Sequence, residues 1–175
     1  NMTLTSQINI IFNLLDQLQC KKVCLIGSSM GGYLATLVAQ VRAEIEATYL
    51  MAPGFNFLER WMLSLKLDCD DETCWESKIP IFHYRYDETR YICTDIFKDA
   101  NNWNPVALNR KVPARIVHGI HDAVVPIDES KKFVSGRPWC SLKELDTDHG
   151  LLSHLGWVVD DCIAFFKKLG ILSTE

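Results

Sequence analysis

The sequence predicts an α/β domain in which helices cover both faces of a mostly parallel sheet. Three observations lead to this class. A short apolar segment at 23–26 precedes a helical pattern at 30–41 and a second buried segment at 47–51, which together form a strand, helix, strand unit. Two further apolar segments, at 114–119 and 141–145, alternate with helical patterns. Strands that are joined through helices in this way are parallel.

The first predicted element is an amphipathic helix that begins near Thr5. Apolar residues recur there at helical spacing, and the pair Thr5 and Ser6 offers side-chain oxygens that can cap free amide groups. The segment 23–26 is almost wholly apolar, which is typical of a strand covered on both faces. The next strand, 47–51, is closed by Ala52-Pro53-Gly54, which cannot continue a strand ladder.

The pattern loosens after Pro53. We interpret about 55–105 as a cap-like insertion over the sheet, within a single domain that spans 1–175. This insertion holds an aromatic-rich helix near Phe55 to Leu67, an acidic turn at Asp68 to Glu72, and a hairpin with strands Ile81–Tyr86 and Arg90–Ile92.

The remaining pattern returns to strands and helices. After the strand at 114–119, a short helix opens near Pro126 and covers Asp128 to Val134, followed by the strand at 141–145. The terminal helix has one apolar face, which carries Trp157, Val158, Cys162, Phe165, Phe166 and Leu169.

Composition and charge exclude several classes of function. The 175 residues carry a formal net charge of -4 that is spread along the chain, so no basic stripe indicates a nucleic-acid partner. The seven cysteines include no C-x-x-C pair, and we expect reduced thiols in a cytoplasmic protein and no metal site. No apolar run reaches the roughly 20 residues that span a bilayer, and we expect no leader before the first helix.

The segment Gly27-Ser28-Ser29-Met30-Gly31 has a G-x-S-x-G pattern between a predicted strand and a predicted helix. Such a turn strains the serine backbone and needs both glycines, because a Cβ at either would collide with neighbouring chain. It lifts the Ser29 hydroxyl above the sheet and directs the Met30 amide toward an incoming carbonyl. We expect Ser29 to be a nucleophile and Met30 an oxyanion donor. A turn that only connects two packed elements is the alternative.

A serine hydroxyl is a weak nucleophile unless a base takes its proton. We predict His149 as this base, because it follows the last strand in the polar loop 146–150, at the carboxyl edge of the sheet. His154 also follows that strand, but its place at the start of the terminal helix favours a surface or capping role.

We predict Asp122 as the acid behind this histidine. It follows the strand that ends near His118, on a loop at the same edge, and can accept the imidazole Nδ1 proton. Asp146 and Asp148 remain alternatives, although such close neighbours of the histidine seldom point at its ring from behind, and a turn-forming role also explains them. His118 and His121 precede the acid, and we interpret them as structural or supporting residues.

These motifs belong to a longer pattern that extends from Thr3 to Phe166. Its matching stretches are Leu4-Thr5-Ser6-Gln7-Ile8, Leu25-Ile26-Gly27-Ser28-Ser29-Met30-Gly31-Gly32-Tyr33, Met51-Ala52-Pro53-Gly54-Phe55, Phe82-His83-Tyr84, Val117-His118-Gly119, His121-Asp122, Val125-Pro126-Ile127, Arg137-Pro138-Trp139, and Glu144-Leu145-Asp146-Thr147-Asp148-His149. The chain therefore resembles the YqiA/YcfP-type small bacterial α/β-hydrolases, especially their cyanobacterial branch. The resemblance implies an α/β-hydrolase fold and a serine esterase for carboxylic esters, with acyl thioesters as a further substrate class and no metal or organic cofactor. The family's catalytic residues map onto Ser29, Asp122 and His149.

The sequence departs from this family at its start. The family pattern begins with strands and a His-Gly loop that donates a second oxyanion amide, all before the helix near Thr5. These N-terminal strands are missing from the 175 residues. Because the strand at 23–26 needs a sheet neighbour on each side, we expect a preceding portion of the protein to supply them.

The insertion is rich in aromatic residues, most of which we expect to form its own small core. We expect Phe55, Trp61 and Tyr84 to line a pocket that accepts short to medium acyl chains. The predicted partner is thus a small-molecule ester or acyl thioester. A catalytically silent binding module and an acyltransferase, both on the same fold, remain alternatives.

Overall fold

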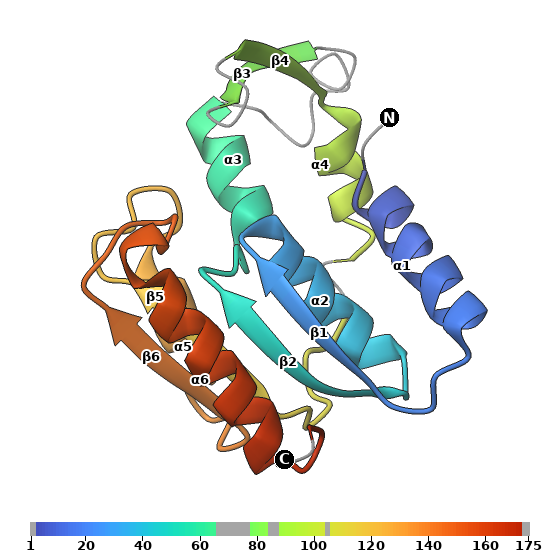
Figure 1. Ribbon diagram of the computed structural model, residues 1–175. Coiled ribbons are helices and arrows are strands. Elements are labelled where there is room, and N and C mark those ends of the chain that lie inside the picture. The colour runs from blue at the N-terminus through green and yellow to red at the C-terminus, as the bar shows by residue number, and fades with distance from the viewer. Residues whose placement is uncertain (1–2, 66–77, 84–87, 104–105, 173–175) are drawn as a thin grey trace. The chain divides into compact units, whose positions relative to one another are not determined.

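The computed structural model describes residues 3–65, 78–83, 88–103 and 106–172 (Figure 1). The elements follow in the order α1 (Leu4–Leu18), β1 (Val23–Ser28), α2 (Met30–Val41), β2 (Ile45–Met51), α3 (Phe57–Leu65), β3 (Lys78–His83), β4 (Glu88–Cys93), α4 (Asp95–Ala100), β5 (Ala114–Gly119), α5 (Ile127–Val134), β6 (Cys140–Leu145), a 3-10 helix (Leu152–His154) and α6 (Leu155–Lys168).

The contacts within the chain divide it into two compact units. One unit consists of Asn1–Gln19 and Asn56–Ala107, and the other of Cys20–Phe55 and Leu108–Glu175. The insertion predicted at about 55–105 corresponds to the second stretch of the first unit. The structure adds α1 to that unit, which periodicity along the chain could not reveal because the two stretches are far apart in sequence.

The second unit is built on a four-stranded parallel sheet with the order β1-β2-β5-β6. Ile26 of β1 is opposite Tyr49 of β2, Leu50 is opposite Ile116 of β5, and Gly119 is opposite Leu145 of β6. The predicted parallel sheet is therefore confirmed. Because all four strands run the same way, the loops after β1, β5 and β6 leave the sheet at the same edge (Figure 1).

Apolar side chains on each face of this sheet form a separate core. One core joins the sheet to α6 and contains Ala47, Tyr49, Val117, Leu145, Leu151, Val158 and Phe166. The core on the opposite face joins the sheet to α2 and α5 through Ala35, Leu50 and Ile116, with Leu25, Phe55, Phe133, Val134 and Leu142 packed against them. Alternate residues of β2 enter opposite cores, as the two-residue period of a strand requires.

Two expectations about buried faces are wrong. The strand at 23–26 was expected to be covered on both faces, but Ile26 is 60% exposed. The reason is that β1 forms the edge of the described sheet and α6 covers the central strands. On the predicted apolar face of the terminal helix, two side chains lie outside the buried stripe: Trp157 of α6, and Leu169, which directly follows α6. The Lys143 ammonium lies over the Trp157 ring at 5.8 Å.

A polar network ties α6 to the sheet. The Tyr49 hydroxyl donates to Asp161 Oδ2 at 2.9 Å, and the Arg115 guanidinium donates to both oxygens of the same carboxylate at 2.8 and 2.7 Å. Burial, together with the bond to Asp161, raises the pKa of Tyr49 well above its usual value. The phenol therefore acts as a hydrogen-bond donor throughout the working pH range.

In the first unit, α1 begins at Leu4, one residue before the predicted start near Thr5. Its N-cap is Thr3, whose hydroxyl accepts the Ser6 amide at 3.1 Å while Ser6 Oγ accepts the Thr3 amide. Thr5 does not cap the helix. Its amide donates to Asp99 at 2.7 Å and its hydroxyl accepts the Trp103 indole N–H at 2.9 Å, which ties α1 to the segment around α4.

The predicted hairpin is confirmed as the antiparallel pair β3 and β4, which starts at Lys78, earlier than expected. The aromatic-rich helix is α3, and it ends at Leu65 within the described residues. The acidic turn at 68–72 lies outside the described residues, as does the hairpin's connection at 84–87.

Three further properties bear on function. None of the helices in the described residues has the length and apolar character to cross a membrane. The described cysteines, which are Cys20, Cys24, Cys93, Cys140 and Cys162, form no disulfide. Within the same ranges, no group of three or more His, Cys, Asp or Glu side chains is placed to hold a metal ion.

Candidate active site

The turn between β1 and α2 holds Ser29 in an unusual backbone conformation. Its φ of 53° and ψ of -123° lie where non-glycine residues are rarely found. Backbone hydrogen bonds fix this conformation. The Ser29 amide donates to the Met51 carbonyl at 2.8 Å, and the Ser29 carbonyl accepts the amides of Gly32 and Gly54, each at 3.0 Å. The end of β2 therefore holds the serine at the tip of the turn.

Close packing around this turn depends on glycine, but not at both predicted positions. A Cβ on Gly27 would overlap the Gly31 carbonyl oxygen, as expected. A Cβ on Gly31 would meet no neighbouring atom, so the expected collision there is wrong. The second crowded position is Gly32, where a Cβ would lie 2.8 Å from Pro53 Cβ. The helix turns Gly31 away from the chain that follows β2 and turns Gly32 toward it.

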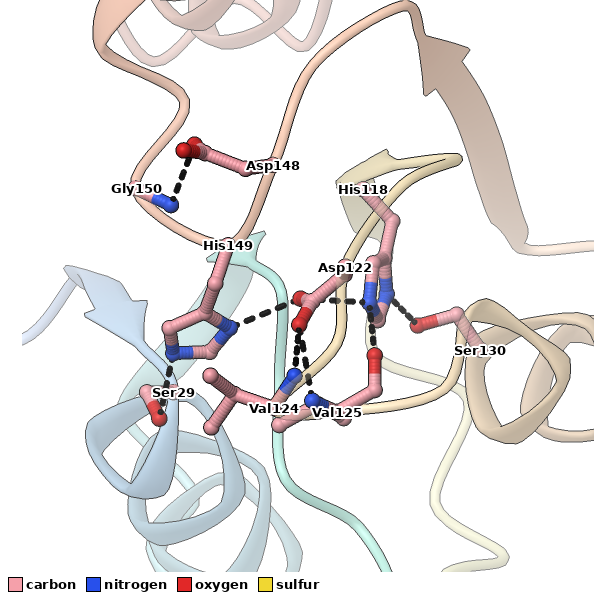
Figure 2. Close-up of polar contacts among 9 residues, drawn as sticks. All are labelled: Ser29, His118, Asp122, Val124, Val125, Ser130, Asp148, His149 and Gly150. Atoms are coloured by element: carbon pink, nitrogen blue, oxygen red, sulfur yellow. Dashed lines mark hydrogen bonds and ion pairs between the residues drawn. The ribbon is translucent and has the colours of Figure 1, made fainter.

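The structure brings Ser29, His149 and Asp122 together, all within the second unit (Figure 2). The distance from Ser29 Oγ to His149 Nε2 is 3.1 Å, and that from His149 Nδ1 to Asp122 Oδ2 is 2.7 Å. The carboxylate requires a proton on Nδ1, which leaves Nε2 free to accept the serine hydroxyl. A hydroxyl, an imidazole and a carboxylate in this order can transfer a proton away from the serine oxygen.

Asp122 is held as a buried carboxylate. Its side chain is 0% exposed, and its Oδ1 accepts the amides of Val124 at 2.8 Å and Val125 at 2.7 Å. Burial by itself would raise the pKa of this carboxyl, but the hydrogen bonds from the two valine amides and from His149 outweigh it. The pKa of Asp122 is therefore below its ordinary value, and the group is ionised at neutral pH.

Met30 is placed as the sequence predicts for an oxyanion donor. It is the first residue of α2, directly after Ser29. The amide of a first helical residue has no acceptor within its own helix, and it lies at the positive end of the helix dipole. This amide can donate to a negative oxygen that forms beside Ser29 Oγ.

Gly119 lets the loop of the acid meet the loop of the histidine. A Cβ at this position would overlap the carbonyl oxygen of Thr147. Next to this contact, the Ile120 amide donates to the Leu145 carbonyl at 2.9 Å and the His121 amide to the Thr147 carbonyl at 3.1 Å. Sequence reasoning missed this role, although a glycine at the end of a strand signals close approach of backbone.

The alternative acids, Asp146 and Asp148, and the alternative base, His154, contact other residues. Asp148 Oδ1 accepts the Gly150 amide at 3.0 Å, which is the turn-forming role allowed for it (Figure 2). Asp146 contacts His121 at 2.8 Å in an exposed pair. His154 Nδ1 lies 3.0 Å from the hydroxyl of its neighbour, Ser153.

The three residues predicted to line an acyl pocket have different surroundings. Phe55 stacks on Phe133, with ring centroids 4.0 Å apart, and packs against a core of the second unit. Trp61 lies in the first unit against Phe97, at 6.1 Å between centroids. Tyr84 lies outside the described residues. A role for these rings in substrate binding stays a prediction.

Solved structures with similar folds include Est1E from Butyrivibrio proteoclasticus, at a TM-score of 0.80 and 20% sequence identity, covering 95% of this chain and 71% of that one. Mouse alpha/beta hydrolase domain-containing protein 10 has a TM-score of 0.76 and 20% identity, covering 97% and 71%. The monoacylglycerol lipase of Paleococcus ferrophilus has a TM-score of 0.65 and 15% identity, covering 91% and 76%. The chain therefore has the α/β-hydrolase fold that the sequence indicated.

Comparison with curated proteins gives no match. One family model does match, over residues 2–167, which is nearly the whole chain. The chain belongs to the uncharacterised protein family UPF0227, the YqiA/YcfP-type family that its motifs resemble.

Proposed function

We propose that this protein is a serine hydrolase that cleaves carboxylic esters through an acyl-Ser29 intermediate. One observation carries the proposal: His149 lies between Ser29 Oγ at 3.1 Å and Asp122 Oδ2 at 2.7 Å. Both distances are within hydrogen-bond reach, as proton transfer requires.

In the first half of the reaction, Ser29 Oγ attacks the ester carbonyl carbon while its proton passes to His149 Nε2. The carbonyl π electrons move to the oxygen, which becomes an oxyanion near the Met30 amide. When this intermediate collapses, the bond to the alcohol oxygen breaks and the proton on Nε2 passes to the leaving alkoxide. The products are acyl-Ser29 and a free alcohol.

In the second half, His149 takes a proton from water, and the resulting hydroxide attacks the acyl carbonyl carbon. The bond to Ser29 Oγ breaks, and the serine oxygen regains the proton from Nε2. Asp122 stays ionised throughout. It holds the imidazole in the Nδ1–H tautomer and stabilises the positive charge that the ring carries between the two transfers.

Two structural relatives support an ester as the substrate. Est1E has been solved with ferulic acid, a carboxylic acid, bound to it, and the Paleococcus ferrophilus protein is a monoacylglycerol lipase. Acyl thioesters are a second substrate class for the same chemistry, because their carbonyl is attacked in the same way. Since the described cysteines form no disulfide, we place this activity in a reducing compartment, the cytoplasm.

A fluorophosphonate probe tests the nucleophile. The probe phosphonylates an activated serine, and peptide mass spectrometry locates the adduct. We expect the adduct on Ser29, none in S29A, and undiminished labelling in S28A, a matched control that removes the neighbouring hydroxyl of the same motif. An adduct on another residue, or equal labelling of S29A, would exclude Ser29 as the nucleophile.

Turnover of p-nitrophenyl esters of increasing acyl length, with and without an added alcohol, tests the reaction. We expect free acid as the main product in both conditions. Transfer of the acyl group to the alcohol would replace the hydrolase with an acyltransferase. Saturable ester binding without release of p-nitrophenol would indicate a silent binding module.

A further inference from the structure

His118 is a buried histidine that lies next to the group formed by Ser29, His149 and Asp122 but is not one of these three residues. It lies in β5, its side chain is 0% exposed, and Figure 2 shows it on the opposite side of Asp122 from His149. Its Nε2 is 2.9 Å from the Val125 carbonyl oxygen and 3.1 Å from Asp122 Oδ2. Its Nδ1 is 2.8 Å from Ser130 Oγ, on α5.

These contacts determine which ring nitrogen carries the proton. The Val125 carbonyl and the ionised Asp122 can only accept, so Nε2 must carry a proton and donate to both. In the neutral ring Nδ1 is then an acceptor, and the Ser130 hydroxyl donates to it. The two acceptors at Nε2 fix the tautomer, and the Ser130 hydroxyl holds the opposite side of the ring. Ser130 therefore restrains the ring and helps to fix the direction of the Nε2–H bond.

The carboxylate of Asp122 consequently receives donors at both oxygens. Oδ1 accepts the Val124 and Val125 amides, and Oδ2 accepts His149 Nδ1 and His118 Nε2. The amide pair fixes one oxygen. The position of the oxygen that meets the imidazole depends on the two histidines, of which only His118 is wholly buried.

We propose that His118, locked by Ser130, is a positioning residue that sets the orientation of Asp122 and, through it, the orientation of His149 toward Ser29. This inference rests on the proposed serine hydrolase function. A buried histidine could satisfy its Nε2–H with the Val125 carbonyl alone. The additional contact with Asp122 Oδ2, on the oxygen that also holds His149, points to a role beyond filling the core.

Variants of His118 and Ser130 separate positioning from packing. H118L removes all three polar contacts of the ring, whereas H118Q can place an amide N–H near the position of Nε2. S130A removes only the donor to Nδ1 and little volume. I116V is the matched control, because Ile116 is buried in the same strand and packs against Ala35 and Leu50. Each variant is assayed for kcat and KM with a p-nitrophenyl ester, for its rate of phosphonylation, and for its folded fraction.

If Asp122 and His149 are no longer held in this orientation, kcat falls and KM stays nearly unchanged, because substrate binding does not involve Asp122. We expect H118L to lower kcat by about tenfold and S130A by about threefold, with H118Q closer to the wild type, at equal folded protein. The phosphonylation rate should fall in parallel. I116V should lose stability and keep its kcat. If H118L and S130A keep the wild-type kcat per folded molecule, or if KM alone rises, the inference is overturned.

A second readout does not depend on turnover. The proton between His149 Nδ1 and Asp122 gives a downfield NMR resonance, which S130A and H118L should shift or broaden and I116V should leave in place. If the wild type is not phosphonylated on Ser29, the proposed function fails, whereas this resonance still reports whether His118 orients Asp122. If the wild type is phosphonylated and neither kcat nor the resonance responds, only the inference about His118 fails.

Discussion

The backbone of Gly119 lies against the carbonyl oxygen of Thr147, so closely that a single added carbon would overlap it. This contact joins the loop after β5, which carries Asp122, to the loop after β6, which carries His149. The side chains that these two loops carry meet in a 2.7 Å bond between His149 Nδ1 and Asp122 Oδ2. The close backbone contact at Gly119 therefore helps to set the geometry of the candidate site, although Gly119 has no side chain that takes part in the reaction.

We expect Gly119→Ala to separate the two loops and reduce phosphonylation of Ser29 strongly, with a loss of about 1–3 kcal/mol in the free energy of unfolding. Denaturant unfolding and the labelling rate measure the two effects. Gly156→Ala is the control, because its Cβ would meet no neighbour and alanine favours a helix. A Gly119→Ala variant with wild-type stability and labelling would refute the role assigned to this contact.

The two glycines after Ser29 should respond in opposite ways. Gly31→Ala should fold and be labelled like the wild type, because the added Cβ meets open space. Gly32→Ala should be destabilised by about 1–3 kcal/mol, because its Cβ would press against Pro53. Thermal unfolding of both variants tests this order of stability. The G-x-S-x-G motif predicts the opposite order, because it includes Gly31 and not Gly32.

The contribution of Asp122 to stability should depend on pH. Because its pKa is lower in the folded protein than in the unfolded chain, the ionised carboxylate stabilises the fold above about pH 4 and loses that effect as pH falls through the folded pKa. We compare urea unfolding of the wild type and D122N across this range. Their difference in unfolding free energy should be constant near neutrality and shrink on acidification. A difference that grows as the pH falls would contradict the lowered pKa.

The network of Tyr49, Asp161 and Arg115 should matter for stability. We expect Tyr49→Phe to cost about 1 kcal/mol and Asp161→Ala about 3 kcal/mol, since the latter leaves a partly buried guanidinium without its carboxylate. The control is Glu144→Ala, which breaks an exposed pair with Lys131 and should cost less than about 1 kcal/mol. If Asp161→Ala and Glu144→Ala lose the same free energy of unfolding, the network stabilises the fold no more than an exposed ion pair does, which would contradict this prediction.

Local patterns were sufficient to predict much of this fold. The helix at Met30–Val41 and the strand at Ala114–Gly119 match the sequence interpretation at both ends. The ends of the strand are marked by Pro113 and Gly119. The membership of α1 in the first unit was not predictable, since the bonds from Thr5 and Trp103 join residues far apart in sequence. Ile26 is exposed because β1 lies at the edge of the described sheet. The apolar composition of the strand does not reveal its position in the sheet.

The candidate site was predictable to a similar degree. Ser29, Asp122 and His149 could be chosen because each follows a strand that ends at the same edge of a parallel sheet. Ser130 could not be chosen, because its contact with His118 arises from the packing of α5 on β5, and serine in a helix has no distinguishing pattern. The crowding at Gly32 likewise comes from Pro53, on a segment that only the folded chain brings near.

The most direct test of the central claim compares the two histidines that follow β6. Phosphonylation of Ser29 is timed in H149A and H154A at the same pH and the same folded concentration. We predict that H149A lowers the rate by at least about a hundredfold, because Ser29 Oγ loses its proton acceptor, whereas H154A retains the wild-type rate. Wild-type labelling of H149A would show that this imidazole does not activate Ser29, and the account would be wrong.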